Sequence, residues 1–186
     1  MEEVKVKIYG VDELTPEAFE SALVSYTCGA EVPWIDENIE SFRAFAEHLG
    51  GKPDFSIGYA CQGTFAKIKM NEVYYYSNSL GDFVLIDTSM KNEELMEYLE
   101  DHFPPSLEDF SGYCVDSDLI GVVRKFMESP IKDHTLEDLL TDVSDELLKI
   151  CDGEYEYFYS DEGFKETAEC NGLNFTEDGT LWNGSA

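Results

Sequence analysis

Hydrophobic and polar positions alternate over the first residues of the chain and follow a helical period over most of the remainder. The alternation in residues 4–9 predicts a half-buried β-strand. Thr15 and Pro16 supply an N-cap and a first-turn proline for a helix of about three turns. A second amphipathic helix is expected to begin at an Asp36 cap and to stop at Gly50, because glycine commonly ends helices.

Turn-forming residues then divide the chain into shorter β-segments, which are followed by a mainly helical region. Strands are expected at 55–60, 64–70, 73–77 and 83–87, and helices at 92–101, 116–128, 135–151 and 160–170. A short strand at 155–159 and a terminal hairpin at 173–175 and 180–182 complete the pattern. We therefore predict an α+β fold, in which a small antiparallel meander is flanked by helices.

The segment Phe103–Ser106, which contains two prolines, is the expected boundary between two parts of the chain. Residues 1–103 are expected to form an α/β part with the antiparallel sheet. Residues 104–186 are expected to form an acidic, mainly helical part that ends in the hairpin. The pattern leaves open whether the two parts share one hydrophobic core.

The charge of the chain is unusual in both size and distribution. The chain contains 40 Asp and Glu residues against 12 Lys and Arg residues, which gives a formal net charge of −28. Residues 76–186 carry 27 of the acids and only six of the bases, and residues 92–123 contain nine acids and no base. Such a field repels nucleic acid and anionic membranes and attracts basic surfaces. We therefore expect a basic protein as partner, with no direct binding to nucleic acid or membrane.

The composition nevertheless indicates a folded chain. Hydrophobic residues make up 43% of it, including 12 Phe and 11 Tyr, which a disordered acidic tail would lack. No run of 18 apolar residues is present, and the first residues do not have the pattern of a signal peptide. Five cysteines, an odd number without a CxxC pair, fit reduced thiols. These features predict a cytoplasmic protein.

The acids recur at helical intervals on several of the predicted helices. In the helix at 135–151, one face is apolar and another carries Asp138, Asp142 and Asp145. Four residues of helix advance about 6 Å, which is the scale on which phosphates follow one another along a nucleic-acid strand. Like charges at this interval repel each other, so selection for stability alone would alternate their signs. The predicted partner-binding residues are these three together with Glu93, Glu97, Glu100, Asp101, Glu154, Glu156, Asp161 and Glu162.

Two plainer interpretations of the acids compete with a binding function. A charged surface keeps a protein soluble, but solubility is reached with far less charge. Adaptation to high salt also enriches acids, yet we expect it to deplete lysine, and ten of the 12 bases are lysine. The acids fit better an array that occupies a phosphate-binding surface, since DNA-binding proteins gain much of their affinity from Lys and Arg contacts to phosphates.

In size, charge and acid-lined helices, the chain resembles the DNA-mimicking anti-restriction and anti-CRISPR proteins of phages and mobile elements. The segments EYEYFYSDEGF (154–164) and LNFTEDGTLW (173–182) resemble parts of small acidic proteins of mobile elements. The resemblance implies an inhibitor, without catalysis or cofactor, that blocks the nucleic-acid-binding groove of a host defence nuclease. Dimers are common among such proteins, so a homodimer is also an expectation. A generic acidic module that binds another basic protein remains an alternative.

Asp109, Asp116 and Asp118 carry an alternative enzyme hypothesis. Carboxylates at this spacing can hold Mg²⁺, as in a small metal-dependent hydrolase, although Asp116 is also the expected N-cap of its helix. The three histidines are far apart and lack a second ligand at metal-binding spacing. No glycine-rich nucleotide motif and no G-x-S-x-G motif occurs. We therefore predict no catalytic residue, no metal ligand and no cofactor, and keep the hydrolase as the alternative.

Overall fold

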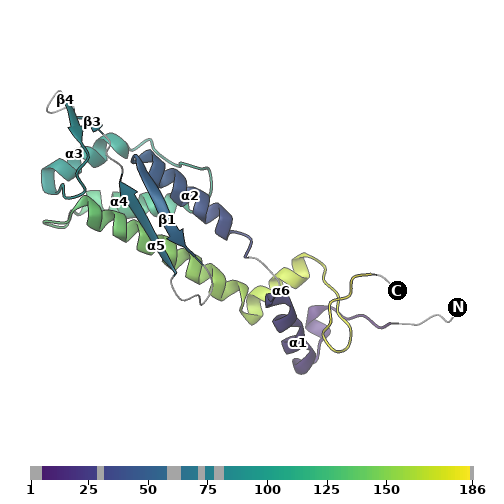
Figure 1. Cartoon of the computed structure of the whole chain (residues 1–186). Coiled ribbons are helices and arrows are strands. Elements are labelled where there is room, and N and C mark those ends of the chain that lie inside the picture. The colour runs from purple at the N-terminus through teal and green to yellow at the C-terminus, as the bar shows by residue number, and fades with distance from the viewer. Residues whose placement is uncertain (1–5, 29–31, 58–63, 71–73, 78–81, 185–186) are drawn as a thin grey trace. The chain divides into compact units, whose positions relative to one another are not determined.

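The computed structural model describes residues 6–28, 32–57, 64–70, 74–77 and 82–184 (Figure 1). The chain divides into two compact units. Met1–Pro33 and Gly153–Ala186 together form what we call the end unit, and Trp34–Asp152 forms the central unit. The central unit is therefore inserted, along the sequence, between the two segments of the end unit. The boundary expected near residue 103 lies inside the central unit.

The central unit contains helices and two small hairpins, so the predicted α+β class is confirmed (Figure 1). Its elements are α2 (Ile35–His48), β1 (Gly51–Ser56), β2 (Phe65–Met70), β3 (Tyr74–Ser77), β4 (Asp82–Leu85), α3 (Asn92–His102), α4 (Asp116–Glu128) and the first part of α5 (Leu136–Phe158). Strands β1 and β2 pair antiparallel, as do β3 and β4, in two separate two-stranded sheets. The prediction of one continuous meander is therefore wrong for the described strands. The turns expected between the strands lie wholly or largely outside the described residues.

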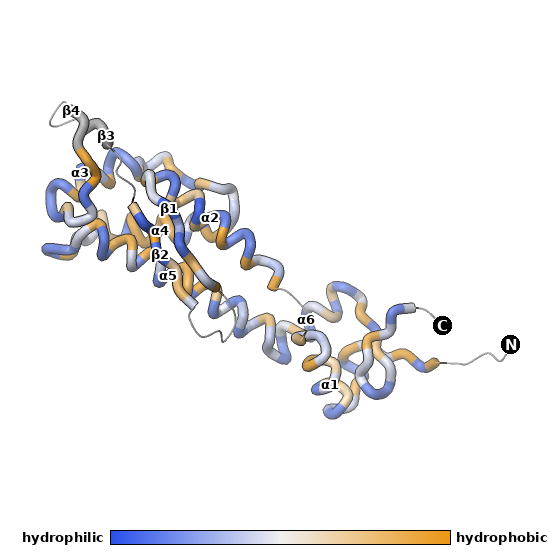
Figure 2. The backbone as a smooth tube through the Cα atoms, viewed as in Figure 1, coloured by the Kyte–Doolittle hydropathy of each residue, from blue (hydrophilic) through white to orange (hydrophobic). Residues whose placement is uncertain are grey.

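The hydrophobic core of the central unit is made mainly by its four helices. Its largest fully buried side chains are Phe42, Phe45, Leu95, Tyr98, Leu99, Leu119, Ile120, Val123, Leu136, Leu139 and Leu147. Within each helix, every one of these residues lies three, four or eight positions from another, as an inward-facing stripe requires. Figure 2 shows the same periodicity as alternating hydrophobic and hydrophilic stretches along these helices.

The helix ends of the central unit follow local rules only in part. Gly50, with a positive φ of 72°, ends α2 as predicted. The residue at the N-cap of α2 is Trp34, and Asp36 lies in the first turn, so the predicted Asp36 cap is wrong. A carboxylate in the first turn still interacts favourably with the positive end of the helix dipole.

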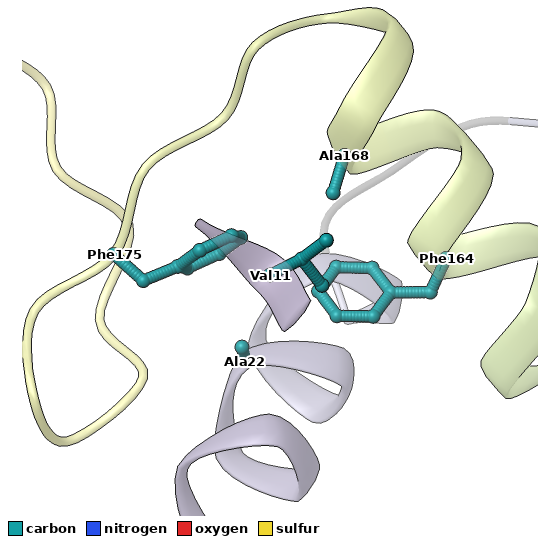
Figure 3. Packing of buried hydrophobic residues seen from close by; sticks show 5 residues of the cluster. All are labelled: Val11, Ala22, Phe164, Ala168 and Phe175. Carbon is teal, nitrogen blue, oxygen red and sulfur yellow. The ribbon is translucent and has the colours of Figure 1, made fainter. Parts of the chain in front are cut away.

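The end unit contains the 3-10 helix η1 (Val11–Glu13), α1 (Pro16–Thr27), the last residues of α5 and α6 (Asp161–Cys170). Thr15 caps α1 by accepting a hydrogen bond from the Ala18 N–H, and Pro16 follows it, as predicted. Its core contains five buried residues, with further partly buried apolar side chains packed around them (Figure 3). The five are Val11, Ala22, Phe164, Ala168 and Phe175.

Two strands predicted in the end unit are not found among its described residues. Described residues 6–8 are not in a strand, and Tyr9 forms an isolated bridge with Phe175. Residues 155–158 continue helix α5, where the rings of Tyr155 and Tyr159 stack with a centroid distance of 6.3 Å. The alternating aromatic pattern misled the prediction, because side chains four residues apart also meet on a helix. The terminal hairpin is present in reduced form, with a bridge between Phe175 and Leu181.

Among the described residues, no helix combines the length and the apolar character that crossing a membrane requires.

Candidate functional site: the acidic groove of the central unit

Helix α3 carries the densest charge among the described helices of the central unit. Five of its eleven residues are acidic, and none is Lys or Arg. Eleven helical residues span about 16 Å, so α3 presents roughly one carboxylate per 3 Å of its axis. One strand of B-DNA presents one phosphate charge per 3.4 Å. The linear charge density of α3 therefore matches that of a nucleic-acid strand.

The position of two of these acids opposes the stability of the helix. Glu93 and Glu94 lie in the first turn, where the positive end of the helix dipole favours carboxylates. Glu100 and Asp101 lie in the last turn, where the negative end disfavours them. Local rules that a chain breaks without structural gain are expected at functional sites. The helix dipole therefore does not account for the acids at the C-terminal end of α3.

Helices α3 and α4 enclose a groove that consists of two hollows, and we call it the α3–α4 groove. The first hollow, of 460 Å³, is lined by Asn92, Glu93, Met96, Glu97, Glu100, Phe126, Pro130, Ile131 and Lys132. The second hollow, of 500 Å³, is lined by Glu100, Phe103, Pro105, Arg124, Met127 and Glu128. Both hollows are lined by Glu100, which lies where they meet. Three of the predicted partner-binding residues thus line one groove.

Backbone contacts hold the start of α5 against the start of α3. Lys91 and Thr135 form an antiparallel bridge. The N–H of Leu136 donates to the carbonyl of Met90 over 3.0 Å. The side-chain oxygen of Asn92 accepts a 3.2 Å hydrogen bond from the N–H of Asp133. The two acid-bearing helices therefore begin side by side.

Two of the three predicted acids on α5 also make local contacts. Asp138 accepts hydrogen bonds from the N–H (2.9 Å) and the hydroxyl of Thr135, while the Thr135 hydroxyl accepts one from the N–H of Asp138. This reciprocal cap stabilises the first turn of α5. The bonds from the Thr135 backbone and hydroxyl lower the pKa of Asp138. Asp138 therefore has a structural role that the sequence prediction did not assign.

Asp142 contacts His134, which in turn packs on a residue that lines the first hollow. The Nε2 atom of His134 is 3.0 Å from an Asp142 carboxylate oxygen. The His134 ring packs on the ring of Phe126, with centroids 5.3 Å apart, and Phe126 lines the first hollow. Asp145 lies one turn further along α5 and is exposed.

The remaining predicted residues, Glu154, Glu156, Asp161 and Glu162, belong to the end unit. Asp161 and Glu162 are in the first turn of α6, directly after its Ser160 cap, where carboxylates stabilise a helix. Glu166 continues this acidic face and accepts a hydrogen bond from the Tyr157 hydroxyl, which raises the pKa of Tyr157 to about 12. The predicted set is therefore divided between two units, with seven of its eleven members in the central unit.

Asp116 has a structural role in a loop. It is 1% exposed, and one carboxylate oxygen accepts hydrogen bonds from the N–H groups of Phe110, Ser111 and Gly112. The residue at the N-cap of α4 is Val115, so the predicted Asp116 cap is wrong. Burial raises the pKa of Asp116, but the hydrogen bonds, led by that from Ser111, outweigh burial and lower it. These bonds use the lone pairs of this oxygen that a metal would need.

The other two residues of the metal hypothesis, Asp109 and Asp118, are exposed. Within the described parts of the chain, no group of three or more His, Cys, Asp and Glu residues is arranged to hold a metal ion.

Comparison with known proteins adds no relative to this picture. No protein-family model, curated protein or solved structure matches the chain.

Sequence reasoning missed the apolar lining of the α3–α4 groove. Met96, Met127 and Ile131 were not singled out, because a methionine or isoleucine on an amphipathic helix or in a loop is usually part of the core. Ile131 is 60% exposed, which only the structure reveals. The one available signal was its position between Pro130 and Lys132, since an apolar residue in a polar loop has no local reason to be there.

Proposed function

We propose that this protein is a DNA mimic, which binds the nucleic-acid-binding groove of a basic protein and inhibits it without catalysis. The resemblance to anti-restriction and anti-CRISPR proteins makes a host defence nuclease of the restriction or CRISPR type the first target to test. The proposed contact surface is α3 with the adjoining start of α5. Glu93, Glu97, Glu100 and Asp101 of α3 supply the main charge, and Asp142 and Asp145 of α5 extend it.

The observation that carries the proposal is the charge density of α3. The helix has roughly one carboxylate per 3 Å of its axis, and a strand of B-DNA has one phosphate charge per 3.4 Å. A folded helix holds these carboxylates in place before binding, so little conformational entropy is lost on association. Salt bridges in the central unit include Glu40 with Arg43 on α2, Asp54 with Lys69 on the β1–β2 hairpin and Glu146 with Lys149 on α5. Another joins Asp133 to Lys91, the N-cap residue of α3, so this base lies at the start of the proposed surface.

The alternatives differ in how far the structure supports them. No observation favours the metal-dependent hydrolase, since one oxygen of Asp116 already accepts three backbone hydrogen bonds. A generic acidic module that binds another basic protein uses the same surface as the proposed inhibitor. The two are separated only by the identity of the partner.

A plasmid-cleavage assay tests the proposal. The purified full chain is titrated into reactions of a restriction endonuclease and of a CRISPR nuclease loaded with guide RNA. We expect inhibition of at least one nuclease, and we expect inhibition to weaken by an order of magnitude or more as salt rises from about 50 to about 200 mM, because phosphate-like contacts are screened. If neither nuclease is inhibited at any salt concentration, the defence-nuclease assignment is wrong.

Two variants with equal changes in charge localise the surface. The first combines Glu93→Gln, Glu97→Gln and Glu100→Gln, and it should weaken inhibition by about tenfold or more. The control combines Glu108→Gln, Asp109→Asn and Asp118→Asn, three exposed residues outside α3 and α5, and it should inhibit like the parent chain. Equal loss of inhibition in both variants would show that net charge, not the α3 surface, is responsible.

The control variant also removes two carboxylates of the hydrolase hypothesis, Asp109 and Asp118. A calorimetric titration of the parent chain and of this variant with Mg²⁺ therefore tests that alternative.

A further inference from the structure

The α3–α4 groove combines an acidic edge with an apolar lining. Met96, Phe126 and Ile131 contribute apolar surface to the first hollow, and Phe103 and Met127 contribute it to the second. Ile131 is the most exposed of the large hydrophobic residues in the described chain, at 60%. The phosphate backbone of a nucleic acid has no apolar surface that corresponds to this lining. The groove therefore contains a recognition element that mimicry of phosphates does not require.

We propose that the α3–α4 groove binds a basic amphipathic helix, with one large apolar side chain in each hollow and lysine or arginine residues along the acidic edge. The inference deepens the proposed function and rests on it for the partner, since it assigns to the basic partner a helical segment that docks in this groove. Methionine suits such a lining, because its flexible, polarizable side chain adapts to different apolar partners.

The spacing of two lining residues fits a helical occupant. Met96 of α3 lines the first hollow, and Phe103, the C-cap residue of α3 seven positions later, lines the second, and seven helical residues advance about 10 Å. Two residues seven apart on an occupying helix lie on one face at the same distance. Recognition of helices in grooves uses anchor residues at these intervals. A helix of about three turns with apolar residues at positions i and i+7 therefore fits both hollows.

The charges of the lining specify a basic occupant. Four glutamates line the two hollows, Glu93, Glu97, Glu100 and Glu128, against the bases Arg124 and Lys132. The guanidinium group of Arg124 donates a hydrogen bond to the carbonyl of Leu107, which fixes it within the protein. The groove thus has an excess of negative charge, and complementary charge on the occupant steers association and sets its register.

Fluorescence anisotropy with a synthetic peptide tests the proposal. The probe is a labelled 14-residue lysine-rich helix with leucines at i and i+7, titrated with the full chain. A second peptide has the same composition in scrambled order, and a third has one of the two leucines replaced by serine. We expect the first peptide to bind at least about tenfold more tightly than the other two, because the scrambled peptide does not place both leucines on one helical face and the third leaves one hollow without an apolar occupant. Equal binding of all three would mean that charge alone is recognised and would overturn the proposal.

Variants of the chain locate the peptide. Ile131→Ser removes an exposed apolar side chain and should weaken binding of the first peptide roughly tenfold without changing its dependence on salt. The matched control is Val24→Ser, which alters a similarly exposed residue on α1 of the end unit and should have no effect. Unchanged binding by the Ile131→Ser variant would exclude the groove.

The peptide assay and the plasmid-cleavage assay fail independently. Peptide binding in the groove without inhibition of a nuclease would retain the groove and refute the defence-nuclease inhibitor. Inhibition that is insensitive to Ile131→Ser, with no preference for the amphipathic peptide, would retain the DNA mimic and refute the groove.

Discussion

The end unit and the central unit bury their hydrophobic cores by different routes. The core of the end unit joins Val11 and Ala22 near one terminus to Phe164, Ala168 and Phe175 near the other. The central unit is one continuous segment, whose helices α2 to α5 follow one another along the chain. Forming the end unit therefore requires closure of a loop of more than a hundred residues, which costs conformational entropy, whereas the central unit forms from nearer contacts.

The two units also differ in what lies beside their acids. In both units, helices carry carboxylates at intervals of three or four residues. In the central unit, the acids of α3 border the apolar lining of the α3–α4 groove. In the end unit, the acids of α6 surround a hollow that Tyr157 also lines, and a second hollow places Asp12, Glu20 and Asp161 beside Val11, Leu14, Phe19 and Leu23. Acids therefore lie beside apolar side chains in both units, and the α3–α4 groove differs in having a strongly exposed apolar residue, Ile131, at 60%.

The largest expected effect comes from a cavity in the core of the end unit. Phe164 is fully buried and packs edge-to-face on the ring of Phe19. Phe164→Ala should reduce the free energy of unfolding of the end unit by about 4 kcal/mol. The chain has two tryptophans, Trp34 in the central unit and Trp182 in the end unit, so each unit has its own fluorescent reporter.

Urea unfolding is then followed in Trp34→Phe and Trp182→Phe backgrounds. The midpoint reported by Trp182 should fall in the Phe164→Ala variant, while that reported by Trp34 stays constant. Leu119→Ala, which creates a cavity in the core of the central unit, should have the reverse effect. If both reporters shift together in both variants, the units unfold as one, and the distinction between them is structural only.

A smaller effect is expected at two glycines of the end unit that have the same conformation and different surroundings. Gly179 has a φ of 85°, and a β-carbon there would lie 2.0 Å from the carbonyl oxygen of Ala18. Gly172 has a φ of 60°, and a β-carbon there would meet no atom within 4 Å. Gly179→Ala should destabilise the end unit by about 3 kcal/mol, since strain of the backbone and a steric clash both act.

Gly172→Ala should cost about 1 kcal/mol, because only the left-handed conformation opposes the alanine. Thermal unfolding monitored through Trp182 measures both variants. Equal destabilisation by the two substitutions would mean that the loop at 176–180 does not pack on α1 in solution.

An effect between those of the two glycine substitutions is expected at Asp116 in the central unit. Asp116→Asn should reduce the free energy of unfolding by roughly 2 kcal/mol at neutral pH, because a charged acceptor is lost from buried N–H donors. The pKa of Asp116 is lowered in the folded state. Its stabilising contribution is therefore complete above the unfolded pKa of about 4 and disappears as the pH falls through the lower, folded value.

Urea unfolding of the parent chain and of the Asp116→Asn variant between about pH 7 and pH 2 measures this difference. The gap in stability should be constant at neutral pH and should narrow below about pH 4. The other carboxylates titrate in both proteins, so their effect on the free energy of unfolding cancels in the difference between the parent chain and the variant. A gap that does not depend on pH would show that hydrogen bonding, and not the charge, accounts for the role of Asp116.

Much of the local structure could be predicted from the sequence. The limits of α4 and α6, the Thr15 cap of α1 and the glycine that ends α2 follow from hydrophobic period and capping chemistry, which act over one or two turns. The two strands predicted at residues 4–9 and 155–159 were less predictable, because a strand needs a neighbouring strand elsewhere in the chain. An alternating pattern does not specify whether such a neighbour exists.

The candidate site was predictable only in its charge. The acids of α3 and α5 were selected by their spacing, and the structure adds that Asp138 caps a helix and that Asp142 contacts His134. The apolar lining between α3 and α4 could not be predicted from the sequence, because it joins residues that are about 30 positions apart along the chain.

The sequence by itself determined the α+β class, the positions of most helices and the excess of carboxylates on their exposed faces, because period, capping and charge are local properties. Only the tertiary structure decided that the chain ends form one unit around an inserted central unit. It also decided that Asp116 is buried under three N–H donors and that Ile131 borders an acidic groove. These features depend on which distant segments meet, and long-range packing fixes that choice.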